Sequence, residues 1–518
     1  MKTADRRIRV FTMALWVTVL TATLLPVLGS LVPPGGDYAV HIARVYVLQN
    51  LANDPVLQRF YETDWAVLPN LAFDLISLAL MKMMGPYAAG RTFVTIAILA
   101  QFVAVACLRY QLHGRIGLLP LTVGLFIYSA PAAHGLASFY LGQSLLLFGV
   151  SLWLASGDWS WRNRVLVTSG MATILFFTHL IIVGLYGLIV GVMRLSQWYR
   201  GRRLTAQDDI PLFAQFAIPL LLWMFVQTPA LGTETVFGPA MARMRALASP
   251  VLYYQTFDFV LALVLLALVI WLLVRQHVRV HPVLVWPISV IAILGLLLPE
   301  ALFGIWLINI RLPVIAVLLL VAAIRIDTTD LRLRWALAIS LILFGAMKLY
   351  RVEQATQVCD ARQRQFVSAL SPLPRGARIL PVMEPVSRLD CLFPVYWHMP
   401  ALAVIEKSAF YPMMAVTVWP LALRPDYRRF AQRKPRPISP QVLIGNTRTY
   451  GEAAWNRMMS ASWRQNFDYL VWMHPGTHPS TRPTGLHKIG GADFFTLYRI
   501  DLPDRPATSP NGQPATTR

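Results

Sequence analysis

Charged residues are scarce in this sequence. Asp, Glu, Lys and Arg make up 14% of the 518 residues, whereas soluble domains carry roughly 25%. Hydrophobic residues make up 56% of the chain, and its mean hydropathy is +0.53. This composition excludes an ordinary soluble domain and predicts a chain that crosses a membrane several times.

Cysteine is equally rare. Cys107, Cys359 and Cys391 are the three cysteines of the sequence, which excludes a disulfide-dense scaffold and a four-thiolate zinc site. Cys107 falls in an apolar stretch. Cys359 and Cys391 fall in the polar C-terminal part, where they can form one bridge if that part is extracytoplasmic.

Several sequence motifs of common chemistry are missing. The chain has no Gly-x-x-x-x-Gly-Lys-Ser/Thr phosphate loop, no His-Glu-x-x-His zinc helix and no Gly-x-Ser-x-Gly elbow. Their absence weighs against ATP-driven transport and against ordinary hydrolase chemistry. Chemistry on a lipid-carried donor needs no nucleotide site and stays open.

Acidic residues are few, at 25 against 46 basic residues, and the net charge is +21. The basic residues lie in short loops between apolar segments. Membrane topology and contact with anionic membrane lipids therefore explain them better than nucleic acid does. We expect membrane lipids as partners and no nucleic acid, while protein partners stay unknown.

Apolar segments are what the sequence has in abundance. They predict a mainly α fold, a polytopic transmembrane bundle with about eleven crossings. Lys2, Arg6, Arg7 and Arg9 precede the uncharged segment 10–32, which we interpret as a retained first span with a cytoplasmic N-terminus. The eleven segments are 10–32, 67–84, 92–108, 117–130, 136–155, 165–193, 211–229, 254–274, 282–298, 312–324 and 335–349.

The threading of the middle segments is open. Simple counting places Arg109, Arg115, Arg162 and Arg164 outside, against the positive-inside rule. A second threading moves them inside, if 67–84 does not cross and 165–193 breaks into two crossings near His179. We slightly favour this second threading, although it leaves Lys82 and Arg91 outside.

The domain organisation follows from a sharp change in composition. Residues 1–349 form the multi-pass domain, with a first outer loop at 33–66. Residues 350–502 are predicted to form a soluble extracytoplasmic α/β domain, with a helix at 352–371 and strands at 378–382, 469–473 and 494–500. Residues 503–518 are rich in Pro, Thr and Ser and are predicted to be disordered. An odd number of crossings places the C-terminal domain in the periplasm, if the membrane is a Gram-negative inner membrane.

Asp37 is the most informative residue. It stands in the loop 33–41, just past the first span, before an apolar stretch that predicts a helix along the membrane surface. An ionisable residue at the mouth of a span is a functional-site hypothesis. The alternative is that Asp37 only caps this helix. His41 is four residues further on and shares a helix face with Asp37 if both are helical.

An acidic first outer loop, surface helices, many spans and an outer soluble domain together resemble the GT-C superfamily of membrane glycosyltransferases. A group of bacterial multi-pass proteins with that layout resembles this chain in five motifs. They are Asp37-Tyr38-x-x-His41-x-Ala43-Arg44, Phe60-Tyr61-Glu62-x-Asp64-Trp65, Leu68-Pro69-Asn70, Thr178-His179 and Asn309-x-Arg311-Leu312-Pro313.

The resemblance implies an enzyme that transfers a sugar from a polyprenyl-phosphate carrier to a lipid, glycan or protein on the outer membrane face. An acidic residue in the first outer loop acts there as base or metal ligand, and by position it is Asp37. Many members carry two adjacent acidic residues, but this chain has a single one. No cofactor is certain, and Mg²⁺ or Mn²⁺ is the candidate.

Further candidates follow from the chemistry of the transfer. It needs a base for the acceptor hydroxyl and a cation for the departing phosphate. Asp37, His41, Glu62 and Asp64 are the catalytic candidates, with a solvated loop edge as the alternative for the last two. The substrate-binding candidates are Arg311, Asn309, His179 and Arg44, and Arg311 alternatively snorkels to the membrane surface.

Two other classes of function remain open on sequence alone. One is a transporter of lipid-linked or polysaccharide material, and the other is a non-catalytic envelope assembly protein.

Overall fold

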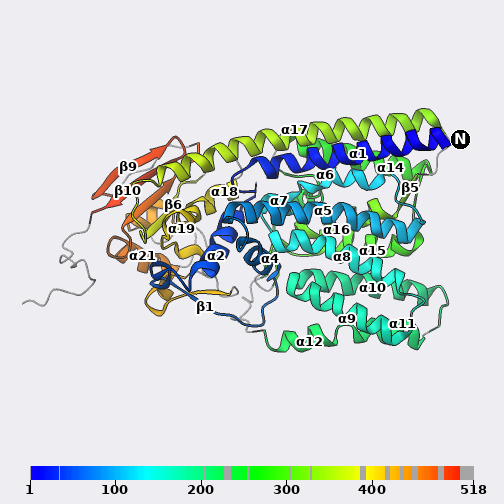
Figure 1. The fold of residues 1–518 in the computed structure, drawn as a ribbon, viewed down its shortest axis with the longest axis horizontal. Helices are drawn as coiled ribbons and strands as arrows, with labels where there is room; N and C mark the ends of the chain where they lie inside the picture. Colours follow the sequence, from blue (N-terminus) through cyan, green and yellow to red (C-terminus); the bar gives the residue numbers. More distant parts are fainter. Residues whose placement is uncertain are drawn as a thin grey trace, which may run out of the picture. The chain divides into compact units, whose positions relative to one another are not determined.

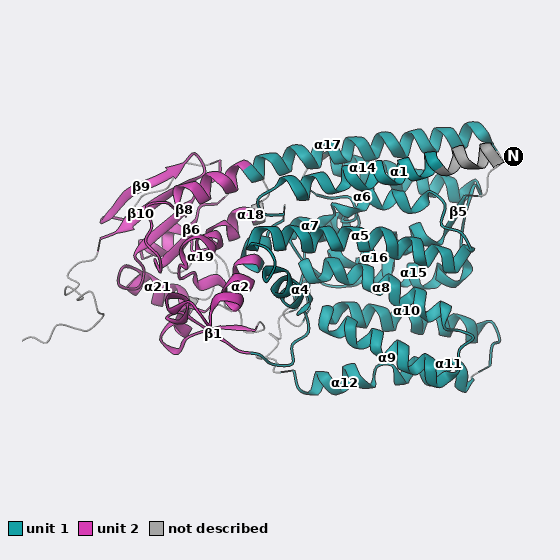
Figure 2. Cartoon of the chain, viewed as in Figure 1, with its two compact units in different colours: residues 1–41, 65–360 teal, residues 42–64, 361–518 magenta. Residues whose placement is uncertain are grey.

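The computed structural model describes most of the chain, in two compact units (Figure 2). Unit 1 comprises Met1–His41 and Trp65–Asp360, and unit 2 comprises Ile42–Asp64 and Ala361–Arg518. The described residues are 2–33, 35–203, 205–226, 235–253, 256–302, 305–326, 330–385, 393–414, 420–431, 437–445, 453–476 and 483–501.

Unit 1 is a bundle of helices (Figure 1). Its elements in chain order are α1 (Lys2–Gly29), α4 (Ala72–Met81), α5 (Pro86–His113), η1 (Leu119–Val123), α6 (Gly124–Ile127), α7 (Ala130–His134), α8 (Ala137–Ala155), α9 (Trp161–Thr178), α10 (Leu180–Tyr199), α11 (Ala206–Ala214), α12 (Ala217–Met224), α13 (Ala240–Ala246), α14 (Thr256–Val274), α15 (Pro282–Leu297) and α16 (Ile308–Ala323). Two short ribbons pair β2 (Val278–Val280) with β5 (Ile324–Ile326) and β3 (Ala301–Leu302) with β4 (Ile305–Trp306). Helix α2 (Tyr38–Asn50) and helix α17 (Leu331–Ala369) run from one unit into the other.

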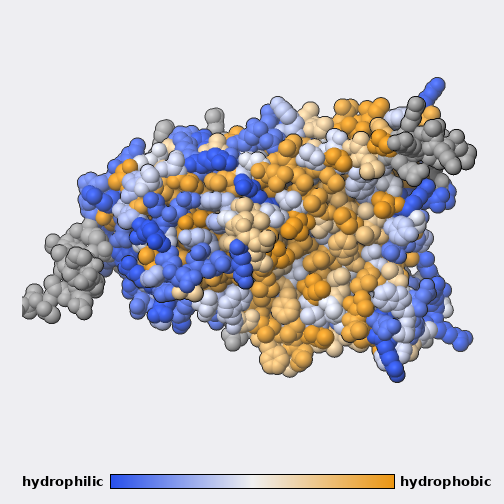
Figure 3. Space-filling model, viewed as in Figure 1, coloured by the Kyte–Doolittle hydropathy of each residue, from blue (hydrophilic) through white to orange (hydrophobic). Residues whose placement is uncertain are grey.

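The apolar helices make this a multi-pass membrane protein. Among the described residues, six helices are long and apolar enough to cross a bilayer: α1, α5, α8, α10, α14 and α17. Three shorter apolar helices accompany them: α4, α15 and α16. Large apolar side chains lie exposed along these helices, and Figure 3 shows hydrophobic atoms over the middle of unit 1 with hydrophilic atoms at the end beyond α11. The predicted mainly α membrane fold is confirmed, and its count of eleven crossings in part.

The segment 165–193 breaks where the second threading requires it. His179 is extended, with φ −169° and ψ 128°, so α9 ends at Thr178 and α10 begins at Leu180. The two helices pack against each other. Helix α4 has 10 residues, about 15 Å of helix, half of a bilayer core. Both features favour the second threading over simple counting.

One end of unit 1 collects basic residues. Arg109, near the end of α5, donates to the Ala322 and Ile324 carbonyls at the end of α16. Arg164 at the start of α9 pairs with Asp208 at 2.9 Å, and Arg194 near the end of α10 pairs with Asp209 at 2.7 Å. The ribbon β2–β5 and α11 lie at this same end (Figure 1).

Unit 2 contains a four-stranded sheet in the order β6-β8-β10-β9. Strands β6 (Ile379–Met383) and β8 (Tyr469–Met473) are parallel, while β10 (Phe495–Ile500) runs antiparallel to β8 and to β9 (Leu486–Ala492). The three predicted strands are therefore present, and the predicted helix 352–371 is the last part of α17. The remaining elements of unit 2 are α3 (Pro55–Gln58), β1 (Tyr61–Thr63), α18 (Phe393–His398), η2 (Met399–Ala401), α19 (Leu402–Lys407), η3 (Pro412–Met414), β7 (Leu421–Leu423), η4 (Pro425–Phe430), α20 (Pro440–Leu443) and α21 (Ala453–Asn466).

Residues 42–64 pack with the rest of unit 2 through side-chain bonds. Asp54 caps α3, accepts from the Ser408 hydroxyl at 2.8 Å and pairs with Arg375 at 2.7 Å. The Tyr61 hydroxyl donates to the Ala409 carbonyl at 3.2 Å, and β1 pairs antiparallel with β7. Burial acts to raise the pKa of Asp54, but these hydrogen bonds and the Arg375 charge outweigh it and hold that pKa below its usual range.

Some predictions fall on residues that are not described. Cys359 is disulfide-bonded and Cys107 is a free thiol, whereas Cys391 lies outside the described residues. The tail 503–518 also lies outside them.

Candidate functional site

Asp37 stands at the entrance to α2, held by its backbone. Its N–H donates to the His134 carbonyl at 3.0 Å, and its own carbonyl accepts from the His41 N–H, the first helical bond of α2. Gly135, with φ +76°, makes this contact possible, since a Cβ there would lie 2.5 Å from the Asp37 nitrogen. Thus α7 and the loop before α2 fix the backbone position of Asp37.

Tyr38 next to Asp37 is a neutral phenol. Its side chain is 2% exposed. Burial, with the Asp37 carboxylate as the smaller cause, raises the pKa of Tyr38. Asp37 therefore stands beside a phenol that keeps its proton.

Arg311 is a buried guanidinium in the first turn of α16. Its Nη1 lies 2.9 Å from His179 Nε2, its Nη2 donates to the Trp306 carbonyl at 3.2 Å, and its Cζ lies 5.1 Å from the centre of the Phe139 ring. The residue is 5% exposed, and its Nε has no hydrogen-bond partner among the described residues. A buried cation with an unused donor is suited to bind an anion.

Asp37 and Arg311 belong to the same unit and interact electrostatically. The Asp37 carboxylate is within electrostatic range of the Arg311 guanidinium and of the His134 ring. Asn309, two residues before Arg311 in α16, is 4% exposed, and its Oδ1 accepts no hydrogen bond from the part of the chain that is described. Polar groups from the loop before α2, from α7, from the α9–α10 junction and from α16 thus converge at one place in unit 1.

His179 connects this cluster to α10. Its Nδ1 accepts from the Ile181 N–H at 3.2 Å, while Nε2 faces Arg311 at 2.9 Å. A neutral imidazole has one acceptor nitrogen, so it cannot serve both donors. If Nδ1 accepts from the Ile181 N–H, the ring has no acceptor left for Arg311. An anion bound at Arg311 would supply the missing acceptor.

The remaining sequence candidates are His41, Glu62, Asp64 and Arg44. The His41 ring packs on Phe73, with centroids 5.4 Å apart, in unit 1. Glu62, Asp64 and Arg44 belong to unit 2. Glu62 pairs with Arg428 at 2.8 Å. Asp64 is exposed and Arg44 is 1% exposed. The roles predicted for all these residues stay predictions.

The groups around Asp37 bear on the cation that the sequence leaves open. Within the described ranges, no three His, Cys, Asp or Glu side chains are close enough together to hold a metal. The charged neighbour of Asp37 is the Arg311 guanidinium, which would repel a second cation. Mg²⁺ or Mn²⁺ stays a sequence-based prediction.

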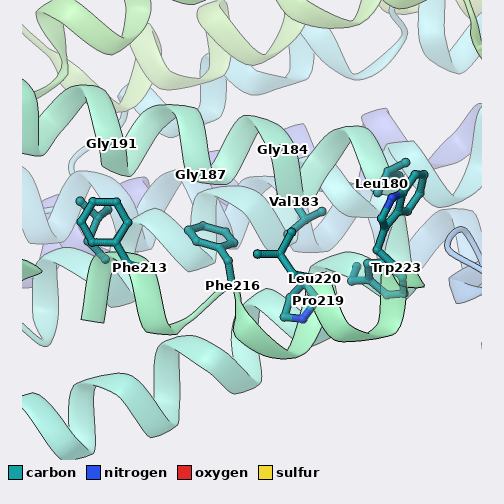
Figure 4. A pocket seen from close by; sticks show the side chains of 12 residues that line it. Leu180, Val183, Gly184, Gly187, Gly191, Phe213, Phe216, Pro219, Leu220 and Trp223 are labelled. Carbon is teal, nitrogen blue, oxygen red and sulfur yellow. The ribbon is translucent and has the colours of Figure 1, made fainter. Parts of the chain in front are cut away.

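An apolar groove of about 570 Å³ lies along α10. It runs between α10 and the pair α11–α12, from Leu180 and Trp223 to Gly191 and Phe213 (Figure 4). The α10 wall has three glycines, and the other wall presents aromatic rings. All the lining residues are apolar: Phe176, Leu180, Val183, Gly184, Gly187, Gly191, Leu212, Phe213, Phe216, Pro219, Leu220 and Trp223.

Sequence reasoning missed this groove and the two residues that frame Arg311. The signal for the groove is the spacing of Gly184, Gly187 and Gly191, which share one face of α10. The Trp306 carbonyl and the Phe139 ring have no sequence signal, because a backbone acceptor and a ring contact depend on how distant segments fold.

Comparison with known proteins adds the fold. No protein-family model matches the sequence, and no curated protein matches it significantly. Among solved structures, apo ArnT from Cupriavidus metallidurans is similar with a TM-score of 0.51 and 14% identity, over 96% of this chain and 98% of ArnT. Two others are weaker. ArnT bound to undecaprenyl phosphate has a TM-score of 0.49 and 11% identity, over 94% and 97% of the two chains. Mycobacterial arabinofuranosyltransferase AftD has a TM-score of 0.43 and 14% identity, over 96% of this chain and 42% of AftD. At this identity the likeness to ArnT shows the fold alone: the chain has the GT-C-like membrane fold that the sequence motifs predict.

Proposed function

We propose that this chain is a GT-C-type glycosyltransferase that takes its sugar from a polyprenyl-phosphate carrier. The observation that carries the proposal is a buried guanidinium, Arg311, which contacts His179 and lies within electrostatic range of the Asp37 carboxylate, in a unit whose helix α10 lines an apolar groove. A phosphate on a long isoprenoid chain matches both the cation and the groove. Undecaprenyl phosphate, the ligand of one ArnT structure, is the carrier to test.

The two charged groups match the two charge changes of an inverting transfer. Asp37 accepts the proton of the acceptor hydroxyl while the hydroxyl oxygen bonds to the anomeric carbon of the sugar. The bond between that carbon and the carrier phosphate breaks, and the phosphate leaves as an anion. Arg311 neutralises this anion through its unused Nε donor and by exchanging its present partners for phosphate oxygens.

The groove supplies a place for the isoprenoid chain of the carrier. Its lining is apolar throughout, and Phe213 and Leu220 on its rim are exposed, at 74% and 64%. Leu180 at one end directly follows His179, which contacts Arg311. Neighbouring residues of the α9–α10 junction thus contribute to the apolar groove and to the cation site, and we propose that one amphipathic lipid occupies both.

For the topology we propose a cytoplasmic N-terminus and an extracytoplasmic site. The end of unit 1 that carries Arg109, Arg164 and Arg194 is the basic one, hence the cytoplasmic one. Asp37 follows the other end of α1, and Arg311 lies at the start of α16, whose last turn is at the basic end. We likewise propose that the C-terminal unit is periplasmic, if the host is Gram-negative.

We keep eleven crossings. The six long apolar helices account for six, and α15 and α16 for two more. The remaining three are α9, residues 119–134, and α11 together with α12.

The test is complementation of a deletion strain with Asp37→Asn and Asp37→Ala. Asp158→Asn is the matched control, since Asp158 is an exposed carboxylate of the same unit between α8 and α9. Membrane levels are checked by immunoblot, and envelope glycans and lipid-linked sugars are profiled by mass spectrometry. We expect the Asp37 variants to lose one glycan species at normal protein levels.

Normal glycans with both Asp37 variants would refute the mechanism. A transporter would keep working with Asp37→Asn, and an assembly protein would depend more on residues 370–518 than on Asp37. A truncated variant that lacks 370–518 separates these two outcomes.

A further inference from the structure

Unit 1 contains a buried ion pair that the transfer mechanism does not use. Lys348 of α17 and Asp258 in the first turn of α14 are 2.8 Å apart, with side chains 1% and 5% exposed. A buried pair gains little net stability over apolar residues of the same size. Its value therefore has to be sought in what it positions.

The pair fixes the segment before α14. Lys348 Nζ also donates to the Val251 carbonyl, and the second Asp258 oxygen accepts from the Tyr253 N–H at 2.7 Å. The Tyr253 ring packs edge-on against Tyr128, with centroids 5.3 Å apart. Two charged side chains from two helices thus hold one short stretch of backbone.

This stretch contacts both halves of the candidate site. The Ser249 hydroxyl donates to the Ile310 carbonyl at 2.8 Å, directly before Arg311. The Ser249 carbonyl accepts from the Ala130 N–H at 2.9 Å, at the start of α7. The last residue of α7, His134, is the one whose carbonyl binds the Asp37 N–H.

We infer that Lys348, Asp258 and Ser249 are positioning residues that set the distance between Asp37 and Arg311. The ion pair fixes the backbone of residues 251–253 through hydrogen bonds. Ser249, two residues earlier, is hydrogen-bonded to α7 and to α16, so it connects this fixed segment to both helices. The role of this distance in catalysis rests on the proposed function. The coupling of the ion pair to α7 and α16 through Ser249 does not.

Two variants test the coupling. Ser249→Ala removes the bond to Ile310 and changes no charge. Lys348→Met with Asp258→Leu removes both charges together, which avoids leaving one of them buried alone. The matched controls are Ser156→Ala, a buried serine that donates to the Trp153 carbonyl, and Arg194→Met with Asp209→Leu, an ion pair of α10 and α11.

The first measurement is hydrogen exchange of the purified full-length protein in detergent. We expect faster exchange at 130–134 and 308–312 in both test variants, with no change there in the controls. The second measurement is the affinity for undecaprenyl phosphate. We expect it to fall about threefold for Ser249→Ala and about tenfold for the double variant, and less than about twofold for the controls.

The outcomes separate the inference from the proposed function. Unchanged exchange at 130–134 and 308–312 in well-folded test variants overturns the coupling. Equal losses in the control pair also overturn it, because they would show a general loss of stability. If the wild type itself does not bind undecaprenyl phosphate, the proposed function fails, while the exchange data still decide the coupling.

Discussion

Replacing Arg311 by Gln is the sharpest perturbation of the candidate site. Gln keeps a polar side chain near the Trp306 carbonyl but removes the positive charge that faces Asp37. It also removes the Nε donor, which finds no acceptor among the described residues. If this donor and this charge serve a carrier phosphate, the loss falls on lipid binding and on departure of the phosphate.

The size of the effect follows from the bonds lost. A hydrogen bond to a charged group contributes about 1.5–3 kcal/mol. Since about 1.4 kcal/mol corresponds to a factor of ten, loss of one such bond weakens phosphate binding about 10- to 140-fold. Arg311→Lys keeps the charge without the planar fork. Its effect should lie between those of Gln and the wild type.

The assay is the affinity of the purified protein for undecaprenyl phosphate in detergent, with undecaprenol as the ligand that lacks the phosphate. Arg91→Gln is the matched control, because Arg91 is a partly exposed arginine whose Nη1 donates to the Ser30 carbonyl near the same end of unit 1. We expect Arg311→Gln to lose affinity for the phosphate and to bind undecaprenol as the wild type does. Equal affinities of Arg311→Gln and wild type for undecaprenyl phosphate would refute the assignment of Arg311.

Three further predictions follow from other parts of the molecule. Gly187→Leu should weaken binding of undecaprenyl phosphate at least about tenfold, while a short-chain analogue should bind as it does to the wild type. The reason is that even a Cβ at Gly187 would lie 3.1 Å from the Phe216 ring. The matched control Gly170→Leu, where a Cβ would have nothing described within 4 Å, should leave the binding of both lipids unchanged. If the Arg311 guanidinium supplies the positive charge at the site, EDTA should leave transfer activity unchanged; activity lost in EDTA and restored by Mg²⁺ or Mn²⁺ would contradict this. Asp54→Asn should destabilise unit 2 by about 1–2 kcal/mol at neutral pH. Since the folded pKa of Asp54 lies below its unfolded value of about 3.9, this stabilisation is present above that value and disappears as the pH falls through the folded pKa. Thermal unfolding of wild type and variant from about pH 7 to about pH 3 checks that the difference shrinks only below about pH 4.

The sequence predicts those elements whose signal is local. Long apolar runs predict the helices α1, α8 and α14, because a span must satisfy its backbone internally and bury few charges. The β-branched and aromatic runs bounded by Gly or Pro predict β6, β8 and β10 for the same kind of reason. The apolar segment 211–229 is less well predicted. Its described part forms the end of α11 and the eight-residue α12, which are separated by a break between Ala214 and Ala217.

The candidate site shows where local signals stop. Asp37 and Arg311 are each predictable from their own surroundings, a carboxylate past the first span and an arginine among apolar residues. Their proximity depends on α7, which holds Asp37, and on Ser249, which contacts α7 and α16. Neither contact has a signature in the sequence, because both use backbone groups.

His179 combines both kinds of information. A histidine inside a long apolar segment predicts a break or a buried polar contact, and here it provides both. The break lets α9 and α10 pack as two helices, and it leaves the ring at their junction, where Nε2 meets Arg311. Because α10 starts at the next residue, one junction supplies both the ring that meets Arg311 and Leu180, the first α10 residue that lines the groove. The same chain break that favours the second threading therefore connects, within two residues, a side chain of the cation site to a side chain of the apolar groove.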